Sequence, residues 1–242
     1  MVLCYHAVSD DWDAALSVTP TAIEEQLSQL CRRGWHGATF TEAVLRPPHR
    51  RTLAVTFDDA FLSVLERALP ILTQLGLPAT VFVPTTFMAR RQRLLWAGID
   101  RWADTDFAAE LEGMNWEDLR LLVAHGWEIG SHTRTHPRLP HLDDGAARHE
   151  LERSRAECEE RLGEACTSIA YPYGHVDQRI LHLAGEVGYA VGAGLSSSLV
   201  PGGPLRWPRI GVYHADQSWR FWLKTNPAVR RIRASRAWPA HE

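Results

Sequence analysis

The chain has 242 residues, of which 45% are hydrophobic and 23% charged, and it carries a formal net charge of −3. This composition is typical of a globular protein and excludes a disordered or fibrous chain. The small negative charge gives no support to nucleic acid as a partner, and no apolar stretch is long enough to form an integral membrane segment. Because the sequence shows no signal peptide, we expect a cytoplasmic location.

Strand and helix signals alternate along the chain, as judged from apolar periodicity and from capping and stop residues. The first half predicts a strand at 2–5, a helix from the capping box at 21–24 to Gly34, strands at 36–40 and 52–57, a helix at 61–75 with Pro70 as a candidate kink, and a strand at 79–83. The second half predicts an irregular insertion at 85–113 with a short helix at 102–111, a helix at 115–125, a strand at 127–130, a helix from Asp143 or Asp144 to Leu162, a strand at 167–171, a helix from Asp177, and strands at 189–193 and 208–213.

This alternation predicts parallel βαβ units, and seven or eight such strands predict a closed or nearly closed barrel. No linker or shift in composition divides the chain. We therefore expect one domain over residues 1–242, with a core at about 1–216 and a basic C-terminal extension at about 226–242.

Polar residues with catalytic potential follow the ends of several predicted strands. They are His6, Asp58-Asp59, His132, Tyr171-Pro172-Tyr173 and His214. The carboxyl ends of parallel barrel strands form one face, and that face carries the chemistry of such barrels. We therefore expect these side chains to share a site.

Two histidines and a pair of acids suggest a metal centre. His132 and His136 are four residues apart, which on a helical turn would place both rings on one side. Two histidines and a carboxylate are a common ligand set of catalytic zinc and of non-haem iron. Of Asp58 and Asp59, one would then bind the metal and the other would act as general base. Exposed loop histidines and a helix-capping acid pair are the alternatives.

At this point the sequence resembles a known family. The segments Thr56–Asp59 (TFDD), Gly130–Pro137 (GSHTRTHP) and Tyr171–Gly174 (YPYG) are similar to three successive motifs of the polysaccharide deacetylases, carbohydrate esterase family four. The opening Leu3–Val8 (LCYHAV) resembles members involved in exopolysaccharide synthesis and modification. The resemblance covers the chain from His6 to about His214.

The resemblance implies a distorted (β/α)7–8 barrel and hydrolysis of N-acetyl groups on sugars, with release of acetate. Matched residue by residue, it implies that Asp59, His132 and His136 hold a divalent metal and that Asp58 is the general base. Zinc is the expected metal, and cobalt, nickel, manganese and iron also suit the ligand set. An N-acetylated sugar is the expected partner.

The sequence departs from the family pattern at three positions. Ala60 stands where the family has Gly, and Ala170 stands where many members have an Arg that pairs with the base. Arg209 is a candidate replacement for that cation, with a surface position as the alternative. His214 is a weak match to the catalytic His of the last motif and is the expected general acid, with His6 as its rival for that role or for shaping the site.

Further residues are expected to bind substrate. By the resemblance, the amide after Tyr173 or its neighbour would stabilise the oxyanion, and Pro172 lies in the same motif. Trp207 is the tryptophan that we expect near the active face, and the insertion at 85–113 could overhang the site. Two alternatives stay open: an amidase with a non-sugar substrate, and a catalytically silent carbohydrate-binding barrel.

Overall fold

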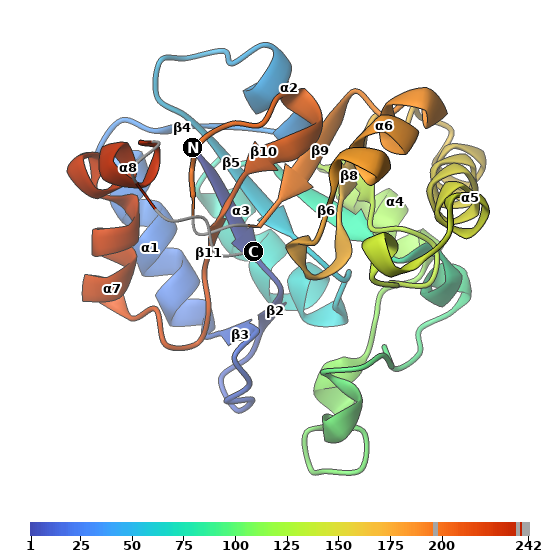
Figure 1. Cartoon of the computed structure of the whole chain (residues 1–242). Helices are drawn as coiled ribbons and strands as arrows, with labels where there is room; N and C mark the ends of the chain where they lie inside the picture. The colour runs from blue at the N-terminus through green and yellow to red at the C-terminus, as the bar shows by residue number, and fades with distance from the viewer. Residues whose placement is uncertain (196–197, 236–237, 239–242) are drawn as a thin grey trace.

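Short parallel strands form a nearly closed barrel, and helices pack around its outside (Figure 1). The computed structural model describes residues 1–195, 198–235 and 238. The strands follow the order β10-β9-β8-β7-β6-β5-β1-β11, and each neighbouring pair is parallel. They are β1 (Val2–Tyr5), β5 (Thr52–Phe57), β6 (Ala79–Val83), β7 (Glu128–Ser131), β8 (Ser168–Ala170), β9 (Val191–Gly194), β10 (Trp207–Pro208) and β11 (Ile210–Gly211). The predicted barrel fold is confirmed.

Further strands lie beside this path, and helices connect the barrel strands. The strands are β4 (His36–Ala38), which pairs with β5, and β2 (Ala7–Val8) with β3 (Ser17–Val18), which form a separate sheet. The α-helices are α1 (Pro20–Arg32), α2 (Phe40–Leu45), α3 (Leu69–Gln74), α4 (Trp116–Ala124), α5 (Asp144–Leu162), α6 (Gln178–Val187), α7 (Ser218–Thr225) and α8 (Pro227–Arg233). Among the described residues, no helix is long and apolar enough to cross a membrane.

The last two strands bring the two edges of the sheet together. β10 pairs with β9 through Trp207 and Ala193, whereas β11 pairs with β1 through Ile210 and Leu3. Arg209 is the one residue between β10 and β11. The predicted strand at 208–213 is therefore two short strands, because the backbone changes its pairing partner at Arg209.

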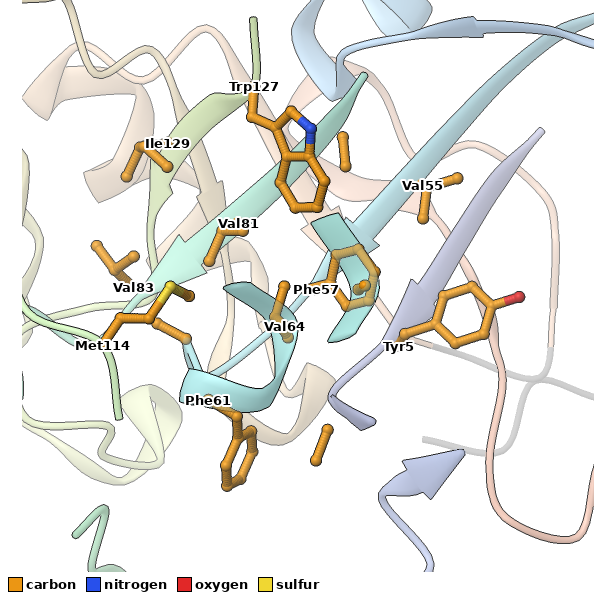
Figure 2. Packing of buried hydrophobic residues seen from close by; sticks show 14 of the residues in the cluster. Tyr5, Val55, Phe57, Phe61, Val64, Val81, Val83, Met114, Trp127 and Ile129 are labelled. Carbon is orange, nitrogen blue, oxygen red and sulfur yellow. The ribbon is translucent and has the colours of Figure 1, made fainter. Parts of the chain in front are cut away.

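Buried side chains alternate between the two sides of the barrel wall. Phe57 points outward and stacks on Trp127, with ring centroids 5.7 Å apart (Figure 2). On the inner side, Ala54 and Phe82 share a smaller cluster with Phe40 from α2. This alternation is expected of strands buried on both faces, and it leaves the residues just beyond each strand at a common end.

Two predicted boundaries near the amino end were wrong by a few residues. The first helix begins at Pro20, because the Thr19 hydroxyl accepts a bond from the Ala22 amide and proline suits the first helical position. The predicted strand at 36–40 ends at Ala38. Thr39 there forms an unforeseen capping box with Glu42 and starts α2.

Two predicted helices also took other forms. The segment 61–75 forms a π-helical turn (Val64–Ala68) followed by α3, and Pro70 lies in the first turn of α3, where its missing N–H does no harm. The segment 102–111 contains one short 3₁₀ helix, Ala108–Leu111, and a second one, Asp100–Trp102, ends at its first residue. There, the Thr105 hydroxyl bonds the backbone of Trp102 and Phe107, which competes with helical pairing.

Candidate active site

Strained backbone marks the loops at one end of the barrel. The non-glycine residues with positive φ in the described chain are Asp59, Ala60, Thr133, His136 and Tyr173. Each lies just beyond β5, β7 or β8, and all lie within one of the three sequence motifs except Ala60, which directly follows Asp59. Such conformations are costly and persist where the surrounding structure enforces them, as at functional sites.

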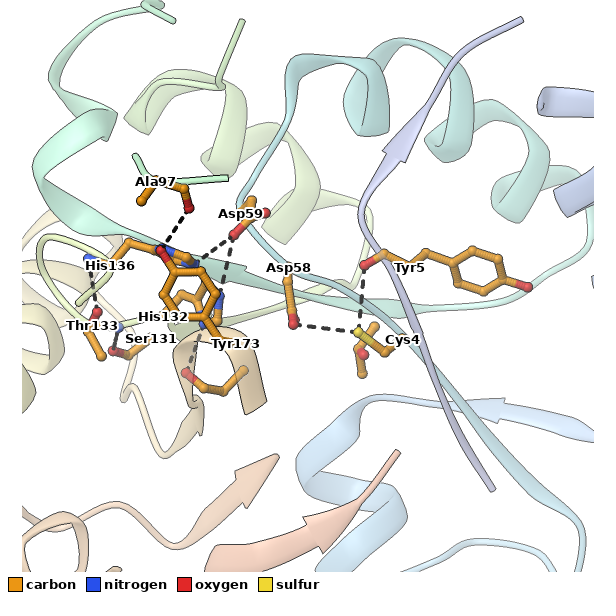
Figure 3. Close-up of polar contacts among 12 residues, drawn as sticks. Cys4, Tyr5, Asp58, Asp59, Ala97, Ser131, His132, Thr133, His136 and Tyr173 are labelled. Atoms are coloured by element: carbon orange, nitrogen blue, oxygen red, sulfur yellow. Dashed lines mark hydrogen bonds and ion pairs between the residues drawn. The ribbon is translucent and has the colours of Figure 1, made fainter. Parts of the chain in front are cut away.

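A carboxylate and two imidazoles meet in the centre of these loops. Asp59 Oδ1 lies 3.4 Å from Nε2 of His132 and 3.4 Å from Nε2 of His136, and Figure 3 shows both rings turned toward it. All three residues are at least 95% buried. Asp59 Oδ1 nevertheless accepts no hydrogen bond from any described residue. Two imidazole nitrogens that converge on one unsatisfied carboxylate oxygen fit a metal ion better than an apolar core.

The protein fixes the orientation of the two histidines by different means. His132 Nδ1 lies 2.8 Å from the carbonyl oxygen of Ala170, which leaves Nε2 free to face Asp59. The ring of His136 is stacked on Trp96 at 4.2 Å and lies edge-on to Tyr173 at 4.7 Å. The predicted helical turn between the histidines is absent, since Thr133 and His136 have positive φ and the segment is a loop.

Glu150 of α5 holds this loop and was not foreseen. Its carboxylate accepts hydrogen bonds from the amides of Arg134 and Thr135, both at 2.8 Å, and from the Thr135 hydroxyl. Glu150 is 8% exposed. A glutamate in a highly charged helix gives no sequence signal of such a role.

Asp58 faces a buried arginine. Arg209 Nη1 donates to Asp58 Oδ1 at 2.6 Å and Nη2 donates to Oδ2 at 2.7 Å, a bidentate pair. The Arg209 side chain is fully buried and also donates to the Thr56 hydroxyl and the Gly194 carbonyl. Burial raises the pKa of Asp58, but the charge and hydrogen bonds of Arg209, together with the nearby histidines, outweigh burial and lower that pKa to about 2. The structure therefore puts Arg209 beside the carboxylate that Ala170 leaves without its usual cation.

His6 and His214 are the two candidates for the general acid, and of these only His6 lies beside the Asp58 carboxylate. His6 is buried, its ring faces Tyr213 at 6.4 Å, and its ring nitrogen lies within 4.8 Å of the nearest Asp58 and Cys4 donor atoms. Burial lowers the pKa of His6, and this effect exceeds that of the negative charge of Asp59, which raises the same pKa. The expected position of His214 is corrected: its side chain is exposed. The chain turns at Tyr213–Asp216, where the Tyr213 amide donates to the Asp216 carboxylate, and this turn directs His214 outward.

The expected substrate-binding residues divide between two places. Tyr173 lies at the cluster, where its hydroxyl donates to the Ala97 carbonyl of the insertion at 3.2 Å (Figure 3). Pro172, the preceding residue, is buried. The insertion thus covers the His136 ring with Trp96. Trp207 instead lines a separate hollow of about 530 Å³, together with His175 and neighbouring loops.

The comparisons with known proteins agree with this geometry. Residues 45–192 match the sequence model of the family described as polysaccharide deacetylase. Over 196 residues the chain is 25% identical to YxkH of Bacillus subtilis (strain 168), a protein named for the same family. The match covers 79% of this chain but 62% of YxkH, so the chain spans less than two thirds of that relative.

Solved structures share the barrel over nearly the whole chain. The Streptococcus pyogenes deacetylase PplD, solved in complex with acetate, has a TM-score of 0.77 at 20% identity and covers 93% of this chain and 97% of its own. IcaB from Ammonifex degensii has a TM-score of 0.69 at 25% identity, with 97% of each chain covered. The fold is therefore shared along the chain, including the parts outside the matched family segment.

Proposed function

We propose a reaction for this chain from its membership of the polysaccharide deacetylase family, whose hydrolases act on carbon–nitrogen bonds other than peptide bonds. The chain removes N-acetyl groups from an amino sugar or from an oligo- or polysaccharide and releases acetate. The observation that carries the proposal is the unsatisfied Asp59 Oδ1, faced at 3.4 Å by both His132 and His136. Buried polar atoms are almost always paired, so this arrangement indicates a cation-binding site.

Asp59, His132 and His136 would hold that cation, since their donor atoms lie within 4.8 Å of one another. A bound divalent metal supplies Lewis-acid polarisation of the acetyl carbonyl and lowers the pKa of a water molecule. We propose zinc, because two imidazoles and one carboxylate are typical of catalytic zinc sites; cobalt, nickel, manganese and iron suit the same donors.

The remaining polar groups divide the proton transfers between them. Asp58 accepts the proton of the attacking water, and Arg209 holds its carboxylate ionised and in place. As the C–N bond breaks, His6 donates a proton to the departing amine nitrogen, and the products are acetate and a free amine. His6 replaces His214 in this role because it alone of the two lies beside Asp58.

The backbone amide of Tyr173 is the proposed donor to the oxyanion. The amide after it, that of Gly174, is already bonded to the Tyr171 carbonyl at 2.9 Å. Tyr173 has a φ of 60°, a conformation that turns its peptide away from the regular strand. Oxyanion donors of this kind are commonly worth a factor of about 10²–10³ in rate.

The ion pair between Arg209 and Asp58 argues against a catalytically silent carbohydrate-binding barrel. That alternative rested on the loss of the cation at Ala170, and Arg209 supplies a cation to the same carboxylate. A non-sugar amidase would use the same centre, so substrate trials must separate the two. The cytoplasmic location stays a prediction, which cell fractionation would test.

The test is acetate release from N-acetylated chitooligosaccharides, run beside simple N-acetyl amides. We expect release that a chelator abolishes and zinc restores, and loss of both bound metal and activity in Asp59→Ala. Asp104→Ala, at an exposed acid of the insertion, is the matched control and should behave as the parent chain. Metal-free protein that gains no metal from zinc or cobalt solution would refute the metal centre, whereas hydrolysis of only the simple amides would refute the sugar substrate.

A further inference from the structure

Helix α7 turns its apolar side to solvent. Phe221 and Thr225 face the protein and are 1% and 4% exposed, whereas Trp219, Trp222 and Leu223 are 64%, 45% and 43% exposed. Positions 219, 222 and 223 lie on one side of a helix, opposite 221 and 225. A surface helix of a globular protein normally has the reverse polarity, with its large apolar residues facing the core.

Exposed arginines accompany this apolar stripe. The sequence from 217 to 241 contains no acidic residue, although the whole chain has a net charge of −3. Arg220 is exposed on α7, with its guanidinium 5.3 Å from the Trp219 ring, and Arg231 is exposed on α8. Ile232 of α8, the helix that packs on α7 (Figure 1), is a further large apolar residue and is 56% exposed. We call the residues Trp219, Arg220, Trp222, Leu223, Arg231 and Ile232 the α7–α8 patch.

We propose that the α7–α8 patch binds the surface of an anionic lipid bilayer. Tryptophan prefers the level of the lipid headgroups, where its ring is buried and its N–H stays wet. Arginines beside such rings add attraction to anionic headgroups, and the pairing of an apolar stripe with flanking cations is typical of helices that lie in the interface plane. Residues 217–241 carry basic side chains and no acidic ones, so this stretch of sequence is complementary in charge to an anionic surface.

A second copy of this chain is a poorer occupant. A twofold dimer would place the same patch against itself, so that Arg220 and Arg231 would approach their own copies without an acidic partner from this stretch of sequence. Like charges brought together across an interface cost binding energy. The charges thus oppose self-association and favour a negatively charged surface.

The patch adjoins the candidate active site. A hollow of about 390 Å³ between α7 and the loop after β11 is lined by Trp219, Arg220, Leu223 and Tyr213. The Tyr213 ring in turn faces His6. Binding through the patch would therefore hold the Tyr213 and His6 side of the candidate active site near the lipid surface. This consequence for catalysis rests on the proposed function, whereas the lipid contact itself does not.

The test is co-sedimentation of the full chain with vesicles of phosphatidylcholine alone or mixed with phosphatidylglycerol. We expect binding to the mixed vesicles, at least tenfold weaker in the double variant Trp219→Ser/Trp222→Ser. Replacing Arg220 and Arg231 with Gln should weaken it by about fivefold for each arginine, and high salt should weaken it as well. Leu121→Ser is the matched control, since Leu121 is a leucine of α4 that is 52% exposed, outside the patch. It should bind as the parent chain does.

Circular dichroism of each variant checks that it folds; if the tryptophan variant does not, the arginine variant decides. Binding that all patch variants retain would overturn the proposal, and so would absence of binding to the mixed vesicles. A parent chain that is dimeric by sedimentation, binds no vesicles, and becomes monomeric in the tryptophan variant would assign the patch to self-association instead. None of these readouts depends on deacetylation, so they stand apart from the test of the proposed function.

Discussion

Replacing Arg209 with methionine would remove the cation from a pair whose members are 0% and 3% exposed, while filling a similar volume. The Asp58 carboxylate would then stay buried without its bidentate partner. Breaking a buried pair from one side costs about 3–5 kcal/mol, because the remaining charge is uncompensated. For a chain of this size, that loss corresponds to a fall of about 10 °C in melting temperature.

The assay is urea unfolding of chelator-treated protein, so that bound metal adds nothing to the stability. Asp58→Asn alone should also destabilise, because Arg209 is then stranded. The double variant Asp58→Asn/Arg209→Met should recover about 2 kcal/mol relative to the sum of the single losses, as expected for residues in direct contact. A loss below about 1 kcal/mol in Arg209→Met, or strict additivity of the two changes, would refute the reasoning that Arg209 compensates a buried charge.

Three further changes test the rest of the site. Glu150→Ala frees the loop of the two metal-site histidines and should weaken zinc binding about tenfold in a competition titration, whereas Glu152→Ala, at an exposed residue of the same helix, should not. His6→Gln should lower kcat by a factor of about 10² or more with metal content unchanged, and His214→Gln should leave kcat within about twofold; the opposite ranking would return the acid role to His214. Trp207→Ala should raise KM several-fold for long oligosaccharides and not for the shortest ones, and equal effects on both would exclude the hollow as a sugar-binding extension.

The sequence predicted the barrel because its signals were local and repeated. Apolar runs such as Thr52–Phe57 and Ala79–Val83 appear as strands with the expected bounds. The errors arose where short-range side-chain bonds decided the outcome. Thr39 starts a helix by capping it, and Thr105 ties an apolar stretch into 3₁₀ turns. A periodicity argument averages over many residues and does not detect a single hydroxyl of this kind.

Residues of the candidate site also differ in how well the sequence could predict them. The sequence could point to Asp58, Asp59, His132 and His136 because they lie in short motifs, and residues that are close in the sequence stay close in the folded chain. Glu150 lies 14 residues beyond the last of them and reaches the loop only because α5 packs beside β7. The different positions of His6 and His214 have a similar origin: both follow strand ends, and the turn at Tyr213–Asp216 directs His214 outward.

The sequence made Arg209 a candidate cation with a surface position as the alternative, and the burial of its neighbours decides between the two. A buried Asp58 requires a cation, and Ala170 fails to supply it, so another strand must do so. In the closing segment, Ile210 is buried among the outer core residues, whereas the neighbouring Trp207 packs against the inner cluster. Side chains alternate along a strand, so Arg209 must point into the barrel with Trp207. An arginine that is buried inside the barrel between two strands needs an acid to compensate its charge. The cation opposite the base is therefore specified by burial and alternation, even though its place in the chain has moved.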